Sequence, residues 1–189
     1  MNRSILLLSI STLWLLTEVL IGRLTHVKSS SGNERDQKSL RVLWLTIIPS
    51  VVLGVVVGIW GIGYVTWFAP IAFPLGLTFI SVGLLLRWWA VYTLRKFFTA
   101  NVAILPDHQL ITFGIYSVLR HPAYTGSLLS FLGLGVVFSN WLSMTIIFIP
   151  IFLAFRYRIQ VEEAVLQETF GAAYEAYARK TKRLLPGVY

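Results

Sequence analysis

The 189-residue chain lacks cysteine and is poor in charged side chains. The absence of cysteine excludes disulfides, thiolate metal sites and a cysteine nucleophile. Charged residues make up 13% of the chain, whereas a water-soluble domain carries about 25%. Hydrophobic residues account for 56% and the mean hydropathy is +0.72, with the apolar residues in long unbroken runs. The composition therefore predicts an all-α, polytopic membrane protein that forms a single integral membrane domain over residues 1–189.

Five apolar runs approach the length of about 20 residues that a helix needs to cross a bilayer. They cover residues 5–24, 43–67, 71–89, 124–138 and 142–155; the fourth is shorter, and the fifth is expected to continue as a polar helix. Pro49 is expected near the start of the second run. We interpret the first run as a span rather than a removable signal peptide, because no small-residue cleavage site follows it. Three spans then fall in residues 1–98 and two in residues 99–189.

Lysine and arginine are distributed unevenly between the two ends of these spans. Cytoplasmic loops carry an excess of both residues. The turns expected at 69–70 and 139–140 have none, and only Arg3 lies on their side. We therefore predict that the N-terminus is outside and that the C-terminal half faces the cytoplasm. We also predict that the basic residues behind the net charge of +8 bind anionic lipid headgroups rather than nucleic acid. The basic residues of the expected cytoplasmic segments are Arg23, Lys28, Arg35, Lys38, Arg41, Arg95, Lys96, Arg120, Arg156, Arg158, Arg179, Lys180, Lys182 and Arg183.

Two charged residues fall inside or beside the apolar runs. Glu18 lies within the first run, where a carboxylate is a functional candidate by default, although it could equally be protonated or pair with a neighbouring helix. Arg87 adjoins Trp88 and Trp89, a pattern typical of an interfacial aromatic belt with a snorkelling cation. Small residues at helical spacing in the second run predict close helix packing: these are Gly54, Gly58 and Gly61.

Polar side chains concentrate just before the fourth run. Residues 112–116 predict a turn, and Pro122, which lacks an N–H, suits the first turn of a new helix. The start of that helix, with Arg120 and His121, can bind a carboxylate or another anion. The alternative is a basic interfacial residue beside an ordinary helix start. The preceding polar residues are Asn101, Asp107, His108 and Gln109.

A second polar cluster follows the fifth run. Arg158 and Glu162 are four residues apart, so they lie on one face of a continuous helix and can interact. We expect this helix to continue past Gly171 as far as Tyr177. The alternative is a solvated salt bridge that contributes less than about 1 kcal/mol. We favour a functional role, because Glu162 and its neighbours emerge at the same membrane face as His121 in a chain with only eight acidic residues. The basic segment 177–186 could lie on the lipid headgroups.

Taken in order, these motifs resemble a known family. The chain is similar to the isoprenylcysteine carboxyl methyltransferases, their shorter prokaryotic members and the related phospholipid methyltransferases. The resemblance covers about residues 99–189, and the N-terminal half matches only as membrane helices. The motifs that carry it are Gly114-Ile115-Tyr116, Arg120-His121-Pro122-Ala123-Tyr124, Arg158 to Glu163, Phe170-Gly171, Tyr174, Tyr177 and Arg183-Leu184-Leu185-Pro186.

The resemblance implies methyl transfer from S-adenosyl-L-methionine without a Rossmann domain. It places Arg158 and Glu162 at the reacting centre as catalytic residues. Arg158 would hold an acceptor carboxylate, for which a planar guanidinium is well shaped, and Glu162 would orient Arg158 or bind the ammonium group of the cofactor. The residues implied for cofactor binding are Tyr116, His121, Pro122, Tyr124, Gly126, Glu163, Leu185 and Pro186.

The resemblance leaves the methyl acceptor open. Our first hypothesis is an amphipathic lipidic acid such as a prenylated cysteine, whose carboxylate is already nucleophilic because its unperturbed pKa is about 4. The alternatives are a phospholipid amine N-methyltransferase, in which Glu162 would help to remove a proton, and a non-catalytic membrane scaffold or transporter. We expect no metal, because His26, His108 and His121 are far apart in a chain without cysteine. The expected location is the inner membrane of a bacterium.

Overall fold

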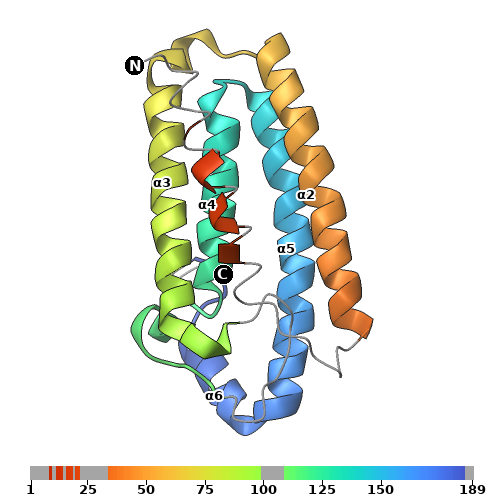
Figure 1. Ribbon diagram of the computed structural model, residues 1–189, viewed down its shortest axis with the longest axis vertical. Helices are drawn as coiled ribbons and strands as arrows, with labels where there is room; N and C mark the ends of the chain where they lie inside the picture. Colours follow the sequence, from red (N-terminus) through yellow and green to blue (C-terminus); the bar gives the residue numbers. More distant parts are fainter. Residues whose placement is uncertain are drawn as a thin grey trace.

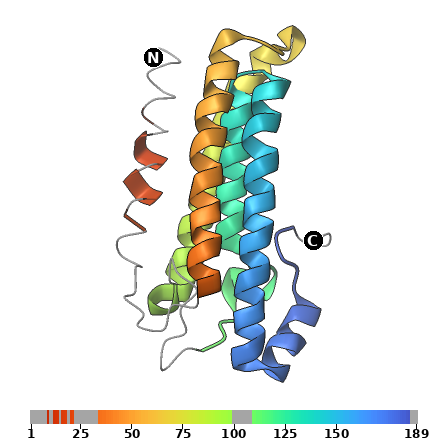
Figure 2. The same ribbon diagram turned by 90° about the vertical axis from the view of Figure 1, so that its right-hand side faces the viewer.

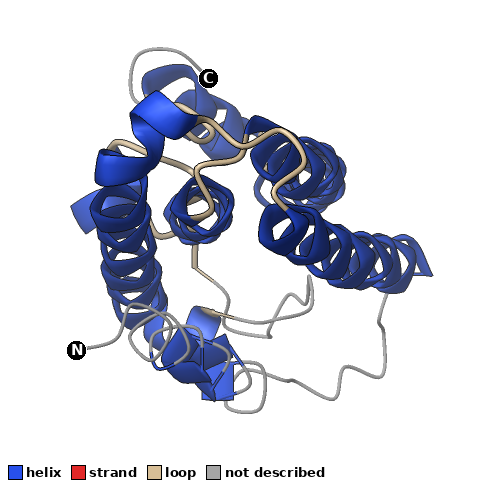
Figure 3. Cartoon of the chain, turned by 90° about the horizontal axis from the view of Figure 1, so that it is seen from above, coloured by secondary structure: helices blue, strands red, loops and turns tan. Residues whose placement is uncertain are grey.

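Four long helices form an antiparallel bundle. A computed structural model describes residues 34–98 and 109–185, together with residues 9, 12–14, 16–18, 20 and 21. Figure 1 shows the helices running alternately up and down, and Figure 3 shows α4 between α3 and α5, with α2 beyond α5. The helix α3 packs on α4, α4 on α5, and α5 on α2. The helices are α2 (Glu34–Trp60), α3 (Ala69–Leu94), α4 (Pro122–Val137), α5 (Trp141–Phe170) and α6 (Ala172–Lys180).

Among the described residues, three segments are long and apolar enough to cross a membrane: Gln37–Trp60, Thr66–Leu94 and Trp141–Phe170. The 16 residues of α4 give it a length of only about 24 Å, and the 30 residues of α5 give about 45 Å at 1.5 Å per residue. The described residues form helices joined by turns and loops, with two isolated β-bridges, Tyr64–Asn140 and Leu119–Lys182, and no β-strand. The prediction of a helical integral membrane protein is confirmed. Most of the first apolar run lies outside the described residues, so the number of five spans stays a prediction.

The helix α2 begins earlier than the apolar run that predicted it. It starts at Glu34, which places Arg35, Lys38 and Arg41 on its first turns rather than in a loop. Pro49, expected near the start of the span, lies in the middle of the helix. The turn expected at 69–70 also lies earlier, because a 3-10 helix, η1, covers Thr66–Phe68 and α3 starts at Ala69. A hydropathy pattern does not predict such a start, because the first turns of the helix are polar and do not belong to the apolar run.

The predicted continuation of the fifth helix to Tyr177 is wrong, because the helix breaks at Gly171. This glycine has a φ of 50°, a left-handed conformation that side-chain-bearing residues adopt only with strain. Its N–H still donates to the Gln167 carbonyl oxygen at 2.9 Å, which ends α5 in an ordinary way. The short helix α6 then folds back beside the end of α5 (Figure 2). The break buries Tyr174 and Tyr177 against the rest of the chain.

Glycines allow the helices to approach closely. A Cβ atom added to Gly83 on α3 would lie 2.5 Å from the Gly126 carbonyl oxygen on α4, and one added to Gly126 would lie 2.6 Å from the Gly83 oxygen. Added Cβ atoms at Gly54 and Gly58 of α2 would also overlap their neighbours, which confirms the predicted packing there. Gly61 does not take part. It follows the last residue of α2 with a φ of 75°, and nothing lies within 4 Å of its added Cβ.

Charged residues gather at one end of the bundle, which we call the charged end. The sequence has no Asp, Glu, Lys or Arg in residues 42–86 or 121–155. Because the helices alternate in direction, the start of α2, the end of α3, the start of α4 and the end of α5 meet at this end (Figure 1). The turns at the opposite end, 61–68 and 138–140, carry no charged side chain. The one-sided distribution is confirmed; the side of the membrane that it faces stays a prediction.

Candidate functional site

The start of α4 is built as the sequence predicted. Pro122 is its first residue and His121 immediately precedes it. A 3-10 helix, η3 (Gly114–Ser117), occupies the expected turn and buries Tyr116. The N–H groups of Tyr124 and Thr125 both donate to the His121 carbonyl oxygen at 3.0 Å. Two backbone N–H groups at the helix start are therefore already bonded, so fewer N–H groups are free to bind an anion than the sequence suggested.

The C-terminal segment runs beside the residues that lead into α4. The N–H of Lys182 donates to the Val118 carbonyl oxygen at 3.2 Å, and the N–H groups of Arg120 and His121 donate to Lys182 and Arg183 at 2.7 and 3.1 Å. These backbone bonds join two parts of the chain that are about 60 residues apart. The C-terminal segment is thereby held at the charged end.

The next residues extend this attachment. The Thr125 hydroxyl donates to the Leu184 carbonyl oxygen at 2.9 Å, and the Leu184 side chain is buried in the apolar core. Leu185, for which the resemblance implied a contact with the cofactor, is exposed at the end of the described chain. Pro186, the other residue of that prediction, lies outside the described residues.

Glu163 is the centre of a group of charged residues that we call the Glu163 cluster: Arg120, His121, Glu163 and Arg183. Glu163 Oε1 accepts a hydrogen bond from Arg120 Nε at 2.9 Å and lies 3.3 Å from His121 Nε2. Its other oxygen accepts from Arg183 Nε at 2.9 Å and lies 2.7 Å from Arg183 Nη2. Both carboxylate oxygens are thus engaged by cations or by the imidazole, so Glu163 ties α5 to the start of α4 and to the C-terminal segment.

Arg120 completes this attachment. Its Nη1 donates to the carbonyl oxygens of Ala178 and Thr181 at 2.8 and 2.6 Å, and its side chain is 11% exposed. The sequence placed Arg120 in a motif but not among the site residues. Arg183, interpreted as part of a segment that could lie on the headgroups, instead binds Glu163. In both cases the signal in the sequence was that the residue opens a motif that carries the family resemblance.

Glu162 has a different environment from that of Glu163. Its Oε2 accepts a hydrogen bond from the Tyr124 hydroxyl at 2.7 Å and lies 3.9 Å from His121 Nδ1. The His121 and Tyr124 rings are stacked, with centroids 5.6 Å apart and an interplanar angle of 12°. The Glu162 side chain is 28% exposed, against 12% for Glu163. Glu162 is therefore the more accessible carboxylate, and its hydrogen-bonding partner is neutral.

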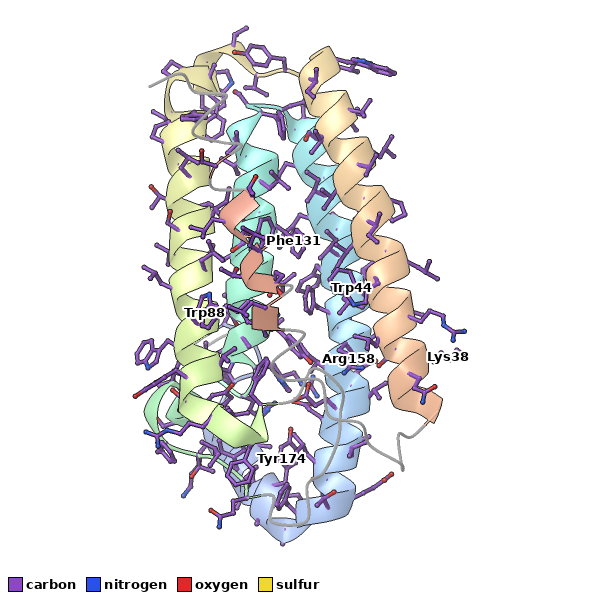
Figure 4. All side chains as sticks on the ribbon, in the orientation of Figure 1. Lys38, Trp44, Trp88, Phe131, Arg158 and Tyr174 are labelled. Carbon is purple, nitrogen blue, oxygen red and sulfur yellow. The ribbon has the colours of Figure 1, made fainter. Side chains whose placement is uncertain are left out.

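Arg158 lies one turn earlier on α5 and is almost fully buried, with 2% of its surface exposed. Its Nη1 donates to the hydroxyl of Ser39 on α2 at 2.6 Å, and Ser39 has no exposed surface. The Tyr124 hydroxyl interacts with both Arg158 and Glu162. Figure 4 shows Arg158 pointing into the space between α4 and α5, whereas Lys38 points away from the bundle. Nothing in the sequence distinguished Ser39 from other helix serines.

Arg87 does not snorkel as predicted but pairs with Glu18. Arg87 Nη2 donates to Glu18 Oε2 at 2.6 Å, and Arg87 Nε lies 2.5 Å from Glu18 Oε1. Its Nη1 also donates to the Ala123 carbonyl oxygen on the first turn of α4, at 3.3 Å. Both side chains are largely removed from solvent, so Arg87 balances its charge by pairing with Glu18 instead of extending to the lipid headgroups. Of the alternatives for Glu18, pairing with a neighbouring helix is the one found.

Two tyrosines brace the wall of the site. The Tyr177 hydroxyl donates to the Tyr116 carbonyl oxygen at 2.8 Å, and the Tyr116 hydroxyl reaches the Ala90 carbonyl oxygen of α3 at 3.5 Å. Burial raises the pKa of Tyr177 to about 12 and that of Tyr116 well above its usual range. Both rings therefore remain neutral. Gly126, another predicted site residue, faces Gly83 of α3, so close helix packing already explains its lack of a side chain.

Comparisons with known proteins point to one family. Residues 75–168 match the model of the isoprenylcysteine carboxyl methyltransferase (ICMT) family. A probable protein-S-isoprenylcysteine O-methyltransferase of Oryza sativa subsp. indica is 37% identical over 113 residues, which cover 59% of each chain. Protein-S-isoprenylcysteine O-methyltransferase B of Arabidopsis thaliana is 35% identical over 115 residues, 60% of this chain and 58% of that protein.

A solved structure has the same fold. The eukaryotic intramembrane Ras methyltransferase ICMT aligns with a TM-score of 0.69 and 24% identity, over 95% of this chain and 64% of that one. The chain spans about three fifths of the length of the curated relatives it matches. The family match ends at Glu168, so α2, α6 and the C-terminal segment lie outside it.

Proposed function

We propose that this chain is a member of the isoprenylcysteine carboxyl methyltransferase family, whose model matches residues 75–168, and that it transfers a methyl group from S-adenosylmethionine to the carboxylate of a lipidic acceptor such as a prenylated cysteine. The observation that carries the proposal is the buried guanidinium of Arg158 next to the accessible carboxylate of Glu162 at the end of an apolar bundle. This arrangement offers one group for an acceptor anion and one for a cofactor cation.

The residues present suit the proposed cofactor. S-adenosylmethionine supplies, when bound, an electrophilic methyl group on a positively charged sulfur. Glu162 is accessible and bonded to a neutral hydroxyl, so its charge is available to an ammonium group. The stacked rings of His121 and Tyr124 offer faces that attract cations. Pro122 and Tyr116 shape the same wall, and we assign Gly126, Leu185 and Pro186 to the cofactor on the family resemblance alone.

Glu163 has a supporting part in this proposal. Its two oxygens are held by Arg120, His121 and Arg183, so it fixes the wall rather than offering a free charge. The sequence implied direct cofactor binding by Glu163. We propose instead that Glu163 acts by positioning His121.

The acceptor carboxylate needs orientation more than activation. A carboxylate with an unperturbed pKa of about 4 is ionised and nucleophilic at neutral pH, so the chain need not remove a proton. The Arg158 guanidinium presents several donors in a plane that matches a carboxylate. Its bond to Ser39 restricts its rotation, and alignment of this kind supplies much of the rate in displacement reactions.

We also propose that the charged end faces the cytoplasm. Arg179, Lys180 and Lys182 are exposed there, and an excess of basic residues near span ends is retained on the cytoplasmic side. An acceptor tail would then lie among the exposed apolar side chains of the helices, with its carboxylate at the charged end.

Binding of S-adenosylmethionine to the detergent-purified full-length protein, measured by calorimetry, tests the proposal. We expect micromolar binding to the wild type and a clear loss of affinity in Glu162→Ala and His121→Ala. Glu175→Ala is the matched control, because Glu175 is an exposed glutamate of α6 whose hydrogen bond is to Gln167. Absence of binding to well-folded wild-type protein would overturn the proposal.

The acceptor is tested separately with labelled methyl donor. A farnesylated cysteine analogue and phosphatidylethanolamine are offered to the same preparation, with Arg158→Lys alongside the wild type. Labelling of the farnesylated carboxylate, reduced in Arg158→Lys because an ammonium lacks the planar pair of donors, supports the proposal. Labelling of phosphatidylethanolamine alone would instead identify an amine methyltransferase.

A further inference from the structure

An ion pair between Glu18 and Arg87 joins the first apolar run to α3. Arg87 Nη2 donates to Glu18 Oε2 at 2.6 Å, and the two side chains are 13% and 21% exposed for Arg87 and Glu18. Removing two charges from water costs about as much as their attraction returns, so such a pair adds little net stability. A charged pair kept inside a membrane helix bundle therefore points to a role other than stability.

Arg87 makes a further contact, with the start of α4. Its Nη1 donates to the carbonyl oxygen of Ala123 at 3.3 Å, and Ala123 is the second residue of that helix. The first turn of a helix is held by fewer backbone hydrogen bonds than its interior, and Pro122 has no N–H to contribute. The guanidinium therefore attaches this turn to α3 and to the first apolar run at once.

Close packing brings the guanidinium to this position. A Cβ atom added to Gly126 on α4 would lie 2.8 Å from Arg87 N and 3.0 Å from Arg87 Cβ. The first apolar run also contacts α4, because the Trp14 and Phe131 rings pack edge to face with centroids 4.8 Å apart. Trp14 and Glu18 are four residues apart, a spacing that places both on one face of a helix. One face of the first run thus reaches α4 directly and through Arg87.

The turn held by Arg87 carries side chains of the site. The Tyr124 hydroxyl donates to Glu162 at 2.7 Å, and the Tyr124 ring stacks on His121. The C-terminal segment holds the same turn through the His121 N–H, which donates to the Arg183 carbonyl oxygen at 3.1 Å. Arg87 supplies a second attachment, from a different part of the chain.

We propose that Arg87 is a positioning residue for the site: it fixes the first turn of α4 through the Ala123 carbonyl, and Glu18 holds its guanidinium in the orientation that this requires. The inference rests on the proposed function, because its catalytic consequence concerns that reaction. The first apolar run then contributes to the site through one carboxylate, and both members of the pair act through His121 and Tyr124.

Hydrogen–deuterium exchange of the detergent-purified full-length protein tests the attachment. Arg87→Lys keeps a cation for Glu18 but lacks the planar fork that serves two acceptors. The amides of Tyr124 and Thr125 donate within the same turn, and we expect them to exchange at least about fivefold faster in Arg87→Lys, because a hydrogen bond that opposes local opening is lost. Arg41→Lys is the matched control, since Arg41 is an exposed arginine of α2, and it should leave these rates unchanged.

Methyl-transfer kinetics show whether the attachment positions the site. The start of α4 carries His121 and Tyr124, which are proposed for the donor, whereas Arg158 of α5 is proposed for the acceptor. We expect Arg87→Lys to raise KM for S-adenosylmethionine at least about fivefold and to leave KM for a farnesylated cysteine analogue within about twofold, since small misplacements are costly in an aligned site. A merely structural defect would lower the amount of active protein, and so the apparent kcat, without moving KM.

Removing both charges separates positioning from stability. Glu18→Gln leaves the Arg87 charge unpaired and should lower the melting temperature by about 6 °C or more, whereas Glu18→Gln combined with Arg87→Met should bring it to within about 4 °C of wild type. The double variant should still show fast exchange and a raised KM for S-adenosylmethionine, because no donor reaches Ala123.

The outcomes separate this inference from the proposed function. Wild-type exchange rates in Arg87→Lys, or wild-type exchange and KM in the double variant, overturn the positioning role. Fast exchange with an unchanged KM makes Arg87 a structural contact only and also overturns it. Wild-type protein that transfers no methyl group overturns the proposed function, and the exchange rates then still decide whether Arg87 holds the start of α4.

Discussion

We expect the attachment of the C-terminal segment to depend more on Arg120 than on Arg183. Both arginines bind Glu163, but Arg120 is 11% exposed in its side chain and Arg183 is 34% exposed. Arg120 also donates to the carbonyl oxygens of Ala178 and Thr181. We therefore expect Arg120→Gln to loosen α6 and the C-terminal segment, and Arg183→Gln to have a small effect.

The magnitudes follow from the burial of the two ion pairs. Removing one partner of a buried pair costs about 3–5 kcal/mol, and the lower end applies here because Glu163 keeps Arg183 and His121. At about 2–4 °C per kcal/mol for a chain of this size, Arg120→Gln should lower the melting temperature by about 6–12 °C. The partly exposed pair of Arg183 contributes about 0–1 kcal/mol, so Arg183→Gln should lower it by less than about 4 °C.

Thermal unfolding of the detergent-purified variants, combined with limited trypsin digestion, measures both effects. Lys180 and Lys182 are exposed, so loosening of the segment should accelerate cleavage after them in Arg120→Gln. Equal losses of melting temperature in the two variants, or a larger loss in Arg183→Gln, would refute the reasoning from burial.

Two further predictions concern packing and the reacting centre. Gly83→Ala forces the α3–α4 contact apart and should lower the free energy of unfolding, measured by melting, by about 1–3 kcal/mol. The control Gly61→Ala meets only backbone strain of about 1–2 kcal/mol, which Gly61→Asn should relieve. A Gly83→Ala protein as stable as wild type would contradict the observed contact. Ser39→Ala removes a bond to Arg158 and should lower kcat for methyl transfer while the S-adenosylmethionine Kd stays constant. Ser39→Thr should restore kcat, and an equal change in Kd would argue against a positioning role for Ser39.

Hydropathy located the helices well but not their ends. The apolar parts of α3, α4 and α5 were predicted because a bilayer core demands long apolar segments. The start of α2 at Glu34 was missed, since a helix that leaves the membrane carries polar turns of no distinctive composition. The break at Gly171 was also missed, because a glycine in a helical pattern either continues the helix or ends it, and only its φ of 50° decides.

The site could be predicted by residue type but not by partner. The motif order brought His121, Tyr124, Glu162 and Glu163 to attention, and the fold places them in contact. The different environments of the two glutamates depend on which helix face each one occupies after the chain folds. The sequence contains no trace of the pairing of Arg158 with Ser39, which are 119 residues apart. Contacts of this kind come from tertiary packing alone.

The length of α5 sets the depth at which the proposed chemistry takes place. The helix begins at Trp141, an exposed aromatic residue of the kind that marks a membrane interface. At 1.5 Å per residue, Arg158 lies about 26 Å and Glu162 about 32 Å along the axis, against a hydrocarbon thickness of about 30 Å. The two groups would therefore straddle the bilayer boundary at the charged end. In the proposed reaction, a lipidic acid would present its carboxylate there without leaving the membrane, and a water-soluble methyl donor would arrive from the other side of the same boundary.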